Sequence, residues 1–451
     1  MPNKIRVYLS RLFVLAVVLV LTVSCASSND QGAGPIQTPE IPVNTCLVDP
    51  NLDLREINPL VYGVNHGPWA VITTNTLPLA QDARITMIRF PGGNWGDEND
   101  LQPYHIDQFV ALADQLGSEV SINVRLHDGS PEKAAELVRY ANIENDYGIR
   151  YWGIGNEPTL FATSRDEPDY GVNRFNEEWR AIAEAMVAVD ESILLIGPEL
   201  HQFGSSLETT PKDPFGLDWM TEFLKANGDL VDFVSIHRYP FPQQSGGRAA
   251  NVEELMNASQ EWDEIIPYLR SLIIEITGED MPIAVTEVNS HWSNAIGGEA
   301  SPDSYANALW WADALGRMIT HNVAMVNYFS LQSNNSTGGY GLFGRTEPRP
   351  TYYVYKIFQE FGDTLVFSGC DSENLSLYTA MDEGENLDLI LINMSAESIS
   401  HALVIEGEER SLVSATIFEQ ETLLQSADIE NYTDLENLTF PAYSITRLKF
   451  E

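Results

Sequence analysis

Two glutamates each follow directly on a short apolar stretch of the sequence. Glu157 closes the stretch YWGIGNE (151–157), and Glu287 closes IAVTE (283–287). Such stretches are typical of strands buried on both faces, so the carboxylate that follows would leave the core at the strand's end. Two facing carboxylates can hydrolyse a glycosidic bond, because one protonates the leaving oxygen while the other attacks the sugar carbon or activates water.

Other polar residues that follow apolar stretches need their own interpretation. Asn156, Glu157 and Pro158 could alternatively form an ordinary turn, since Asn and Pro favour turns. Glu199 closes SILLIGPE and is a rival carboxylate, which we expect to support the site or to bind sugar. The eight His residues lack metal-binding spacing such as H-E-x-x-H, so neither a catalytic metal nor another cofactor is predicted. Further acidic residues after strands are interpreted mostly as loop or cap residues: Asp97, Glu98, Asp100 and Asp128.

The apolar stretches belong to a repeating pattern. Helical periodicity separates them, for example from Ile106 to Leu116, where Gly117 can close the helix, and from the N-cap pair Ser130 and Pro131 onward. Eight strand–helix units predict an α/β fold, the (β/α)₈ TIM barrel, with a doubly wound open sheet as the alternative. The expected strands are 60–65, 85–90, 119–125, 150–157, 192–199, 231–237, 281–287 and 323–329.

A barrel would bring the two glutamates together. Barrel enzymes carry their chemistry at the carboxyl ends of the strands, which open on one mouth. Glu157 would end the fourth strand and Glu287 the seventh, so their side chains could face each other. Direct attack by one carboxylate gives retention of the anomeric configuration and needs the two groups about 5–5.5 Å apart.

The pattern changes after Asp363. Residues 364–451 contain strand-like stretches separated by polar turns and no long helical pattern. This pattern predicts a small C-terminal antiparallel β-sandwich domain. Residues 44–54 are expected to add a strand to that domain, and the catalytic barrel is expected to span 55–363.

The first residues have the character of an export signal. A basic segment precedes an apolar stretch that ends at Cys25 and is shorter than the roughly 20 residues of a membrane span. The sequence LTVSC (21–25) resembles a bacterial lipobox. We therefore predict a lipoprotein signal peptide over 1–25, lipidation of Cys25 and a flexible tether over 26–43. The chain would be exported and anchored by lipid to a bacterial membrane, at the cell surface or in the periplasm.

Two cysteines remain beyond Cys25. An exported protein meets an oxidising compartment, in which a disulfide persists. We predict a Cys46–Cys370 disulfide that ties the start of the folded region to the C-terminal domain; two buried free thiols are the alternative. Metal ligation by this pair is not expected, because no neighbouring ligands have fitting spacing.

The charge balance restricts the partners. Asp and Glu outnumber Lys and Arg by 65 to 25, which gives a formal net charge of −40. Such a surface repels polyanions, so no nucleic-acid partner is expected, and a polymeric substrate would be a neutral carbohydrate. The sequence does not indicate an oligomeric state.

Four motifs in strand order resemble a known group of enzymes. They are the Asn-Glu pair at 156–157, RFPGGNWGDEN after the second strand, SIHRYP after the sixth, and Glu287 after the seventh. Over roughly 55–365 the chain resembles the retaining glycoside hydrolases of clan A, with similarity to α-L-arabinofuranosidase, β-xylosidase and endoglucanase-type (β/α)₈ families. The segment RPTYYVYKIFQEFGD (349–363) also recurs where such barrels pass into a β-sandwich.

The resemblance implies roles for the matching residues. It makes Glu157 the acid/base and Glu287 the nucleophile. Asn156 would hydrogen-bond the 2-hydroxyl of the sugar. Arg89 would orient the nucleophile, and Tyr239 would donate a hydrogen bond to it.

Other residues would complete the sugar pocket. By the same resemblance Asn94 lines the pocket and His237 forms part of its wall. Many clan members carry a Trp at the end of the eighth strand, where this chain has Tyr328 and Phe329, one of which would have to serve. Aromatic side chains at the mouth can stack on sugar rings or pack in the core. The candidates are Trp69, Trp95 and Trp292.

These observations favour an exported retaining glycosidase that cleaves neutral poly- or oligosaccharides by double displacement. Glu157 is expected to hold its proton near neutrality, because the charge of Glu287 and partial burial would raise its pKa. Arg89 and Tyr239 are expected to keep Glu287 ionised. A non-catalytic glycan-binding surface lipoprotein is the alternative, and an inverting hydrolase or a transglycosylase is a third interpretation. The sugar, the linkage, and exo or endo action stay open.

Overall fold

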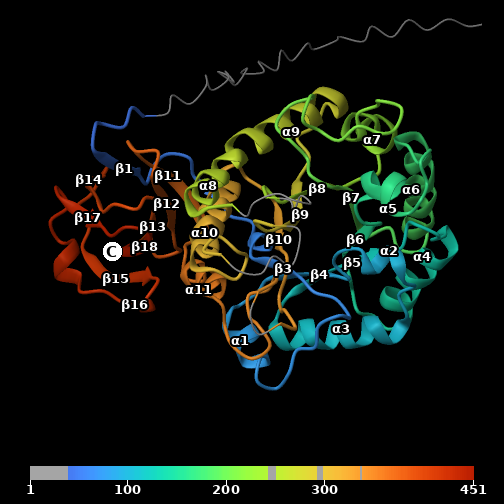
Figure 1. Cartoon of the computed structure of the whole chain (residues 1–451), viewed down its shortest axis with the longest axis horizontal. Coiled ribbons are helices and arrows are strands. Elements are labelled where there is room, and N and C mark those ends of the chain that lie inside the picture. Colours follow the sequence, from blue (N-terminus) through green and yellow to red (C-terminus); the bar gives the residue numbers. More distant parts are fainter. Residues whose placement is uncertain (1–38, 242–249, 292–297, 336–337) are drawn as a thin grey trace, which may run out of the picture. The chain divides into compact units, whose positions relative to one another are not determined.

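The computed structural model describes residues 39–241, 250–291, 298–335 and 338–451. Residues Ile41–Glu451 form one compact unit, which contains a barrel and a C-terminal sheet (Figure 1). The predicted signal peptide, Cys25 and most of the predicted tether lie outside the described residues.

Eight parallel strands form a closed barrel within this unit. Each predicted strand overlaps one of them, and the ring closes where the last strand pairs with the first, with Asn327 opposite Gly63. The closed ring confirms the predicted (β/α)₈ fold and rules out the open sheet. The strands are β3 (Gly63–Asn65), β4 (Met87–Phe90), β5 (Glu119–Val124), β6 (Tyr151–Ile154), β7 (Leu194–Leu200), β8 (Phe233–Arg238), β9 (Ile283–Val288) and β10 (Met325–Tyr328).

Helices surround the barrel, and their ends follow the sequence signals (Figure 1). Ser130 caps the helix that starts at Pro131 by accepting from the Lys133 backbone N–H over 3.3 Å. Gly117 ends the preceding helix in the left-handed conformation, with φ of 69°. The helices are α1 (Leu77–Asp82), α2 (Trp95–Glu98), α3 (Pro103–Leu116), α4 (Pro131–Val138), α5 (Phe161–Ser164), α6 (Val172–Val187), α7 (Trp219–Asn227), α8 (Val252–Ala258), α9 (Trp262–Thr277), α10 (Tyr305–Thr320) and α11 (Pro350–Phe358).

The interior of the barrel changes from apolar to polar along the strands. At the amino ends a separate buried cluster fills the ring, made of Leu60, Met87, Tyr151, Ile196, Phe233, Ala284 and Met325. Inward side chains recur every second residue of a strand. Two residues further along three of these strands lie Arg89, Ser235 and Asn327, all fully buried. The carboxyl end of the barrel is therefore lined by polar groups.

Irregular pairing at the carboxyl ends re-aims side chains into this polar layer. Ile236 on β8 pairs with Val285 on β9, whereas the next residue, His237, pairs with Glu287, so Thr286 is the extra residue of a bulge. The bulge allows the side chains of both Thr286 and Glu287 to point into the barrel interior. β7 has a similar shift against β8 between Gly197 and Leu200.

The C-terminal sheet has the strand order β16-β15-β18-β13-β12-β11-β1-β14-β17. β11 changes partner along its length, because residues 364–366 pair with β12 and residues 367–370 pair with β1. The short strand β2 (Arg55–Glu56) also pairs with β11. The other strands are β1 (Thr45–Asp49), β11 (Thr364–Cys370), β12 (Leu375–Met381), β13 (Leu387–Asn393), β14 (Ile399–Ile405), β15 (Leu412–Glu419), β16 (Leu423–Ser426), β17 (Leu438–Phe440) and β18 (Ser444–Phe450).

The two halves of this sheet enclose a common apolar core. Val48 and Leu403, from β1 and β14, belong to the same buried cluster as Leu377, Leu389 and Leu448, from β12, β13 and β18. A strand that changes partner and two layers that share one core make a β-sandwich. The predicted C-terminal β-sandwich is therefore present, with one parallel pair, β1 and β14, among its antiparallel strands.

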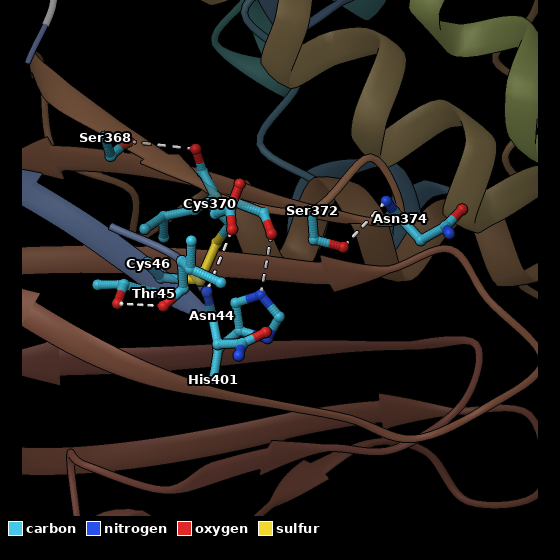
Figure 2. The surroundings of a disulfide bond; sticks show 11 residues. Asn44, Thr45, Cys46, Ser368, Cys370, Ser372, Asn374 and His401 are labelled. Carbon is cyan, nitrogen blue, oxygen red and sulfur yellow. Dashed lines mark hydrogen bonds between the residues drawn. A yellow bond between two sulfur atoms is a disulfide. The ribbon is translucent and has the colours of Figure 1, made fainter. Parts of the chain in front are cut away.

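The predicted disulfide joins β1 to β11 (Figure 2). Cys46 lies opposite Cys370 in the antiparallel pair, and their sulfur atoms are bonded over 324 residues of sequence. Next to the bond, the Asn44 backbone N–H donates to Asp371 Oδ2 over 3.1 Å, and His401 Nε2 lies 3.2 Å from the Asp371 carbonyl oxygen. This bond confirms the predicted pairing and excludes the free thiols.

Hydrogen bonds link the sandwich to the outer helices of the barrel. The Tyr378 hydroxyl of β12 donates to Asp313 Oδ1 of α10 over 2.7 Å, and the Tyr305 hydroxyl of α10 donates to the Tyr443 carbonyl over 2.6 Å.

Among the described residues, no helix combines the length and the apolar character that crossing a membrane requires.

Candidate active site

Glu287 ends β9 and is held by three hydrogen-bond donors. Arg89 Nη1 and the Gly93 backbone N–H both donate to Oε1 over 2.8 Å, and the Tyr239 hydroxyl donates to Oε2 over 2.8 Å. Only 3% of Glu287 is exposed. Charge-assisted hydrogen bonds of this kind stabilise a carboxylate and fix its direction. The structure thus brings Arg89 and Tyr239 onto the carboxylate with which the resemblance associates them.

Gly93 supplies a backbone donor that a larger residue could not easily supply. Its φ is 64°, which is the left-handed region that favours glycine. The Pro-Gly-Gly-Asn motif therefore lets the backbone approach Glu287 closely.

Glu157 follows β6 and contacts two imidazoles. Nδ1 of His201 lies 2.7 Å from Oε1, and Nδ1 of His237 lies 3.0 Å from the same oxygen. Glu157 has a left-handed backbone, with φ of 49°, which costs a non-glycine residue about 1–2 kcal/mol. Strained backbone of this kind concentrates where a side chain must be aimed for function. The strand end therefore turns the carboxylate toward the barrel axis.

The two catalytic candidates lie close together across the mouth. One oxygen of Glu157, one oxygen of Glu287 and one nitrogen of His237 are all within 4.8 Å of one another. This spacing is close to the roughly 5–5.5 Å of retaining glycosidases, in which one carboxylate attacks the sugar itself. It is shorter than the gap of about 6.5–9.5 Å of inverting enzymes, in which a water molecule intervenes.

The expectation that Glu157 holds the resting proton is wrong. Burial favours the protonated form of Glu157, but its contacts with His201 and His237 outweigh burial and lower the pKa of this carboxyl below its ordinary value. Burial also opposes the charge on His237, yet Glu287, Glu157 and Glu199 raise the pKa of this imidazole to about 9. These contacts therefore favour a proton on His237 over one on Glu157.

Glu199 is the third buried carboxylate of the cluster. It ends β7 with φ of 61° and is fully buried. Its Oε2 lies 2.7 Å from His237 Nε2, and it accepts from Thr286 Oγ1 over 2.5 Å and from Arg89 Nη2 over 3.3 Å. Burial opposes its charge, but Arg89 and His237 lower the pKa of Glu199 to about 2. Of the two roles expected for Glu199, its burial fits support of the site.

A second chain of contacts fixes Asn156. Its Oδ1 accepts from Arg89 Nη2 over 2.9 Å, and its Nδ2 donates to Asn94 Oδ1 over 3.1 Å. Asp97 Oδ2 accepts from the Asn156 backbone N–H over 2.7 Å, while its Oδ1 accepts from the Leu126 backbone N–H over 2.8 Å. Asp97 was expected to be a loop or cap residue, and in the structure this buried carboxylate ties the ends of β5 and β6 to α2.

An aromatic group lies beside the nucleophile candidate. Phe329 follows β10, stacks on Trp69 at 6.2 Å between centroids and meets the edge of Tyr340 at 5.0 Å. Burial raises the pKa of Tyr340, and the charges of Glu287 and Glu157 raise it further, so its hydroxyl stays protonated near both carboxylates. Phe329 therefore occupies the mouth position at the end of the eighth strand.

Tyr328 does not serve the pocket, which corrects one prediction. Its neighbour Asn327 is in register with the inward residue Gly63, so Tyr328 points to the outside of the barrel. There its ring packs on Trp311 at 4.7 Å, and its hydroxyl accepts from Asn307 Nδ2 over 3.0 Å. Its side chain is fully buried between the barrel and α10.

The two remaining tryptophan candidates are less informative. Trp95 begins α2 and meets the edge of His105 at 5.2 Å, so its stacking on a sugar stays a prediction. Trp292 lies outside the described residues.

The same cluster is the one place in the described ranges where three potential metal ligands converge, namely Glu157, His237 and Glu287. Both oxygens of Glu287 already accept from Arg89, Gly93 and Tyr239, and Glu157 Oε1 already contacts both imidazoles. An ion would have to displace these partners, so we assign no metal to the cluster.

A cavity of about 490 Å³ is lined by neither carboxylate, so it is not the site. The loop after β3 and α3 contribute to its lining. Its lining includes His66, Ile72, Leu77, Phe109 and Leu112.

Sequence reasoning missed Gly93, His201 and Tyr340 as parts of the site. His201 could have been found, because it lies two residues after Glu199 and would share its face of the strand. Gly93 and Tyr340 reach the site through loop conformations, which carry no periodic signal.

Comparison with known proteins places this geometry in context. The profile of glycosyl hydrolases family 39 matches residues 147–390, a little over half of the 451 residues. The chain is 26% identical over 289 residues to an intracellular exo-α-(1→5)-L-arabinofuranosidase of Halalkalibacterium halodurans, covering 51% of this chain and 53% of that protein. It is 26% identical over 327 residues to endoglucanase A of Paenibacillus lautus, covering 60% of this chain and 43% of that protein. The chain thus spans about half the length of these curated relatives.

The fold is shared with solved structures as well. The α-L-arabinofuranosidase of Thermotoga maritima, in its arabinose complex, superposes with a TM-score of 0.71 at 16% identity. The match covers 90% of this chain and 99% of that one. This similarity extends the shared architecture to the barrel and the β-sandwich together.

Proposed function

The chain belongs to glycosyl hydrolase family 39, in clan A, and we propose that it cleaves neutral poly- or oligosaccharides with retention of configuration. In the first step Glu287 attacks the anomeric carbon while a proton passes from Glu157 to the departing glycosidic oxygen. A glycosyl ester on Glu287 results. In the second step water attacks the anomeric carbon, Glu157 accepts the proton of the water, and the ester bond to Glu287 breaks.

One observation carries this proposal: the oxygens of Glu157 and Glu287 lie within 4.8 Å. An inverting enzyme keeps its two carboxyl groups about 6.5–9.5 Å apart to leave room for a water molecule, and the spacing here is shorter. Arg89, Gly93 and Tyr239 donate to the two oxygens of Glu287 and so orient this carboxylate for attack.

The surroundings of the pair support catalysis rather than simple glycan capture. A protein that only binds glycans has no need of three strained or buried carboxylates compensated by Arg89 and His237. Such groups cost stability and are retained where chemistry uses them.

We propose α-L-arabinofuranosides as the first substrate class to test. The names of several relatives, among them the Halalkalibacterium halodurans enzyme, and the Pro-Gly-Gly-Asn motif support this class. The endoglucanase relative makes neutral β-glucans the second class. The net charge of −40 disfavours anionic polysaccharides in both cases.

The purified chain should first be screened with chromogenic glycosides of both classes and with neutral polysaccharides. On the best substrate, proton NMR should then identify the anomer that forms first. The proposal expects the anomeric configuration of the substrate. An inverted first product, or the absence of turnover on every glycoside, would contradict it.

We also propose that the chain is exported and held at a bacterial membrane by lipid on Cys25. The basic start, the apolar stretch and LTVSC (21–25) support this proposal. Expression with radiolabelled palmitate should label the wild-type chain and not Cys25→Ala, which should move to the soluble fraction. Equal labelling of the two chains would refute the assignment of Cys25.

A further inference from the structure

Three side chains from consecutive strands form a continuous path to the acid/base. Glu199 of β7 lies 2.7 Å from His237 Nε2, and His237 Nδ1 on β8 lies 3.0 Å from Glu157 Oε1 after β6. Glu199 and His237 are fully buried, so neither can touch a sugar from solvent. Both nitrogens of the imidazole therefore face carboxylates.

Glu199 is fixed in its ionised form by its other neighbours. Arg89 Nη2 and Thr286 Oγ1 donate to Oε2, and Asn123 Nδ2 lies 3.4 Å from Oε1. A carboxylate that is fully buried and surrounded by donors cannot attack a sugar or protonate a leaving group. It can act only through the groups that it contacts, His237 and Arg89.

The charges in the cluster require one proton in addition to Arg89. Glu157, Glu199 and Glu287 supply three negative charges inside the barrel mouth, against the single fixed charge of Arg89. His237 contacts two of these carboxylates directly, and its Nδ1 lies 3.7 Å from Glu287 Oε2. The other titratable groups in contact are His201 on Glu157 and the Tyr239 hydroxyl on Glu287. At neutral pH the pKa of His237, about 9, keeps the extra proton on this imidazole.

This arrangement poses a chemical problem for the proposed function. Glu157 is ionised at rest because two imidazoles contact its Oε1, yet the first step needs a proton on Glu157. We propose that the Glu199–His237 pair stores the proton that Glu157 delivers to the leaving group, and receives it back in the second step. Glu199 and His237 are thus positioning residues for the acid/base. The inference rests on the proposed glycosidase function.

The proton and the electrons balance over one turnover. The Nδ1–H bond of His237 breaks and an O–H bond forms at Glu157 Oε1; His237 becomes neutral and keeps its Nε2–H on Glu199. Glu157 then passes the proton to the glycosidic oxygen as the C–O bond breaks and Glu287 bonds to carbon. In the second step the ester bond between Glu287 and the sugar carbon breaks as water gives its hydroxide to that carbon and its proton to Glu157. The proton then returns from Glu157 to His237 Nδ1.

The charge on the nucleophile Glu287 determines when these proton transfers occur. While Glu287 is ionised, its charge at 3.7 Å holds the proton on His237. As Glu287 bonds to the sugar it loses that charge, so the imidazole releases the proton when the leaving group needs it. When the ester is hydrolysed the charge reappears and draws the proton back.

The test compares wild type with Glu199→Gln on two substrates that share one sugar. One substrate carries a 2,4-dinitrophenyl leaving group, which departs without protonation, and the other carries an alkyl or sugar leaving group, which needs it. We expect kcat/KM for the poor leaving group to fall by about 10-fold or more, and that for the dinitrophenyl substrate by less than about threefold. The basic limb of the pH profile should also move to lower pH by about one unit, because His237 loses the charge that raises its pKa.

Two further variants keep the test decisive. Glu261→Gln removes a carboxylate that lies 2.5 Å from Arg238 Nη2, and Arg238 follows His237 in sequence. This variant should leave kcat/KM for both substrates and the pH profile unchanged. His237→Gln, which cannot titrate, should show the same dependence on the leaving group as Glu199→Gln.

The failures are distinguishable. Suppose that the wild type is active and that Glu199→Gln either loses kcat/KM equally on both substrates or keeps the basic limb of its pH profile. Either result would overturn the proton store and leave the glycosidase function standing. A wild type without turnover on any glycoside would overturn the proposed function and the inference with it.

Discussion

The two ends of the barrel interior differ although the same strands build both. At the amino ends Met87, Phe233 and Met325 belong to a buried apolar layer. At the carboxyl ends, on the same strands, Arg89 and His237 belong to a fully buried network of charges. The ladder hydrogen bonds are shared, so the difference lies in side chains two or four residues apart.

Stability and chemistry are therefore separated along the strand. Burying apolar side chains contributes about 25 cal/mol for each Å² removed from water, so the amino-end layer stabilises the fold. Burying three carboxylates costs free energy that Arg89 and the His237 proton only offset. Substitutions in the amino-end layer should therefore lower the stability of the fold, and substitutions in the carboxyl-end layer should lower activity.

The strongest test of the carboxyl-end layer is Glu287→Gln. Without a nucleophile the first step cannot form an ester, and we expect kcat to fall by about 10⁴-fold or more. Steady-state kinetics on the best chromogenic glycoside measure the loss, and circular dichroism checks the fold. Full-rate hydrolysis by this variant would break the assignment of the layer to chemistry.

Glu157→Gln should cost less and should depend on the substrate. General acid catalysis contributes about 10²–10⁴-fold, so turnover of unactivated glycosides should fall by that factor. A dinitrophenyl glycoside should still form the glycosyl-enzyme, because its leaving group needs no proton. A loss of the first step on both substrates alike would count against the acid/base role.

Phe233→Ala tests the amino-end layer. Phe233 meets the edge of Tyr151 at 5.7 Å, and the cavity left by truncation should lower the unfolding free energy by about 3–5 kcal/mol. Because the carboxyl ends are unchanged, kcat per folded molecule should stay near wild type. Phe215→Ala, at a 66% exposed position, is the matched control and should change neither property. A large drop in kcat with unchanged stability would contradict the assignment of the amino-end layer to stability.

Removing the disulfide should act like the amino-end layer, on stability alone. The Cys46→Ala, Cys370→Ala double variant loses a constraint across 324 residues, and we expect a loss of about 2–5 kcal/mol, read as a lower midpoint in thermal unfolding. The wild type in reducing agent should match the variant. An unchanged midpoint would show that β1 is held by its neighbours without the bond.

The smallest effect concerns pH and sharpens the role of His237. Its folded pKa of about 9 exceeds the ordinary value of His, so its contribution to stability is complete below about pH 6.5 and is lost as the pH rises through 9. Between these limits wild type should lose on the order of 2 kcal/mol more than His237→Gln. Denaturant unfolding at several pH values measures the difference. Parallel curves for the two proteins would show that His237 is neutral in the folded state.

Sequence reasoning located the elements and the charged pair for physical reasons that are visible in the chain. Continuous apolar stretches mark strands buried on both faces, and a barrel forces their ends together, which was enough to pair Glu157 with Glu287. The Cys46–Cys370 bond was predicted from the expected export of the chain and from the number of cysteines.

What the sequence did not reveal depends on bulges and on neighbours in space. Tyr328 and Phe329 are adjacent aromatic residues, and only the register of Asn327 with Gly63 shows which one faces outward. The ionisation of Glu157 depends on His201 and His237, which come from other strands, so no local pattern predicts it.

In the proposed mechanism Glu287 attacks the sugar while Glu157 donates and accepts the proton. Incubation with a 2-deoxy-2-fluoro glycoside of the best substrate, which carries a good leaving group, should trap the ester, and peptide mass spectrometry should locate it. We expect one label per chain, on the peptide that contains Glu287. A label on Glu157 or Glu199, or turnover without any trapped ester, would contradict it.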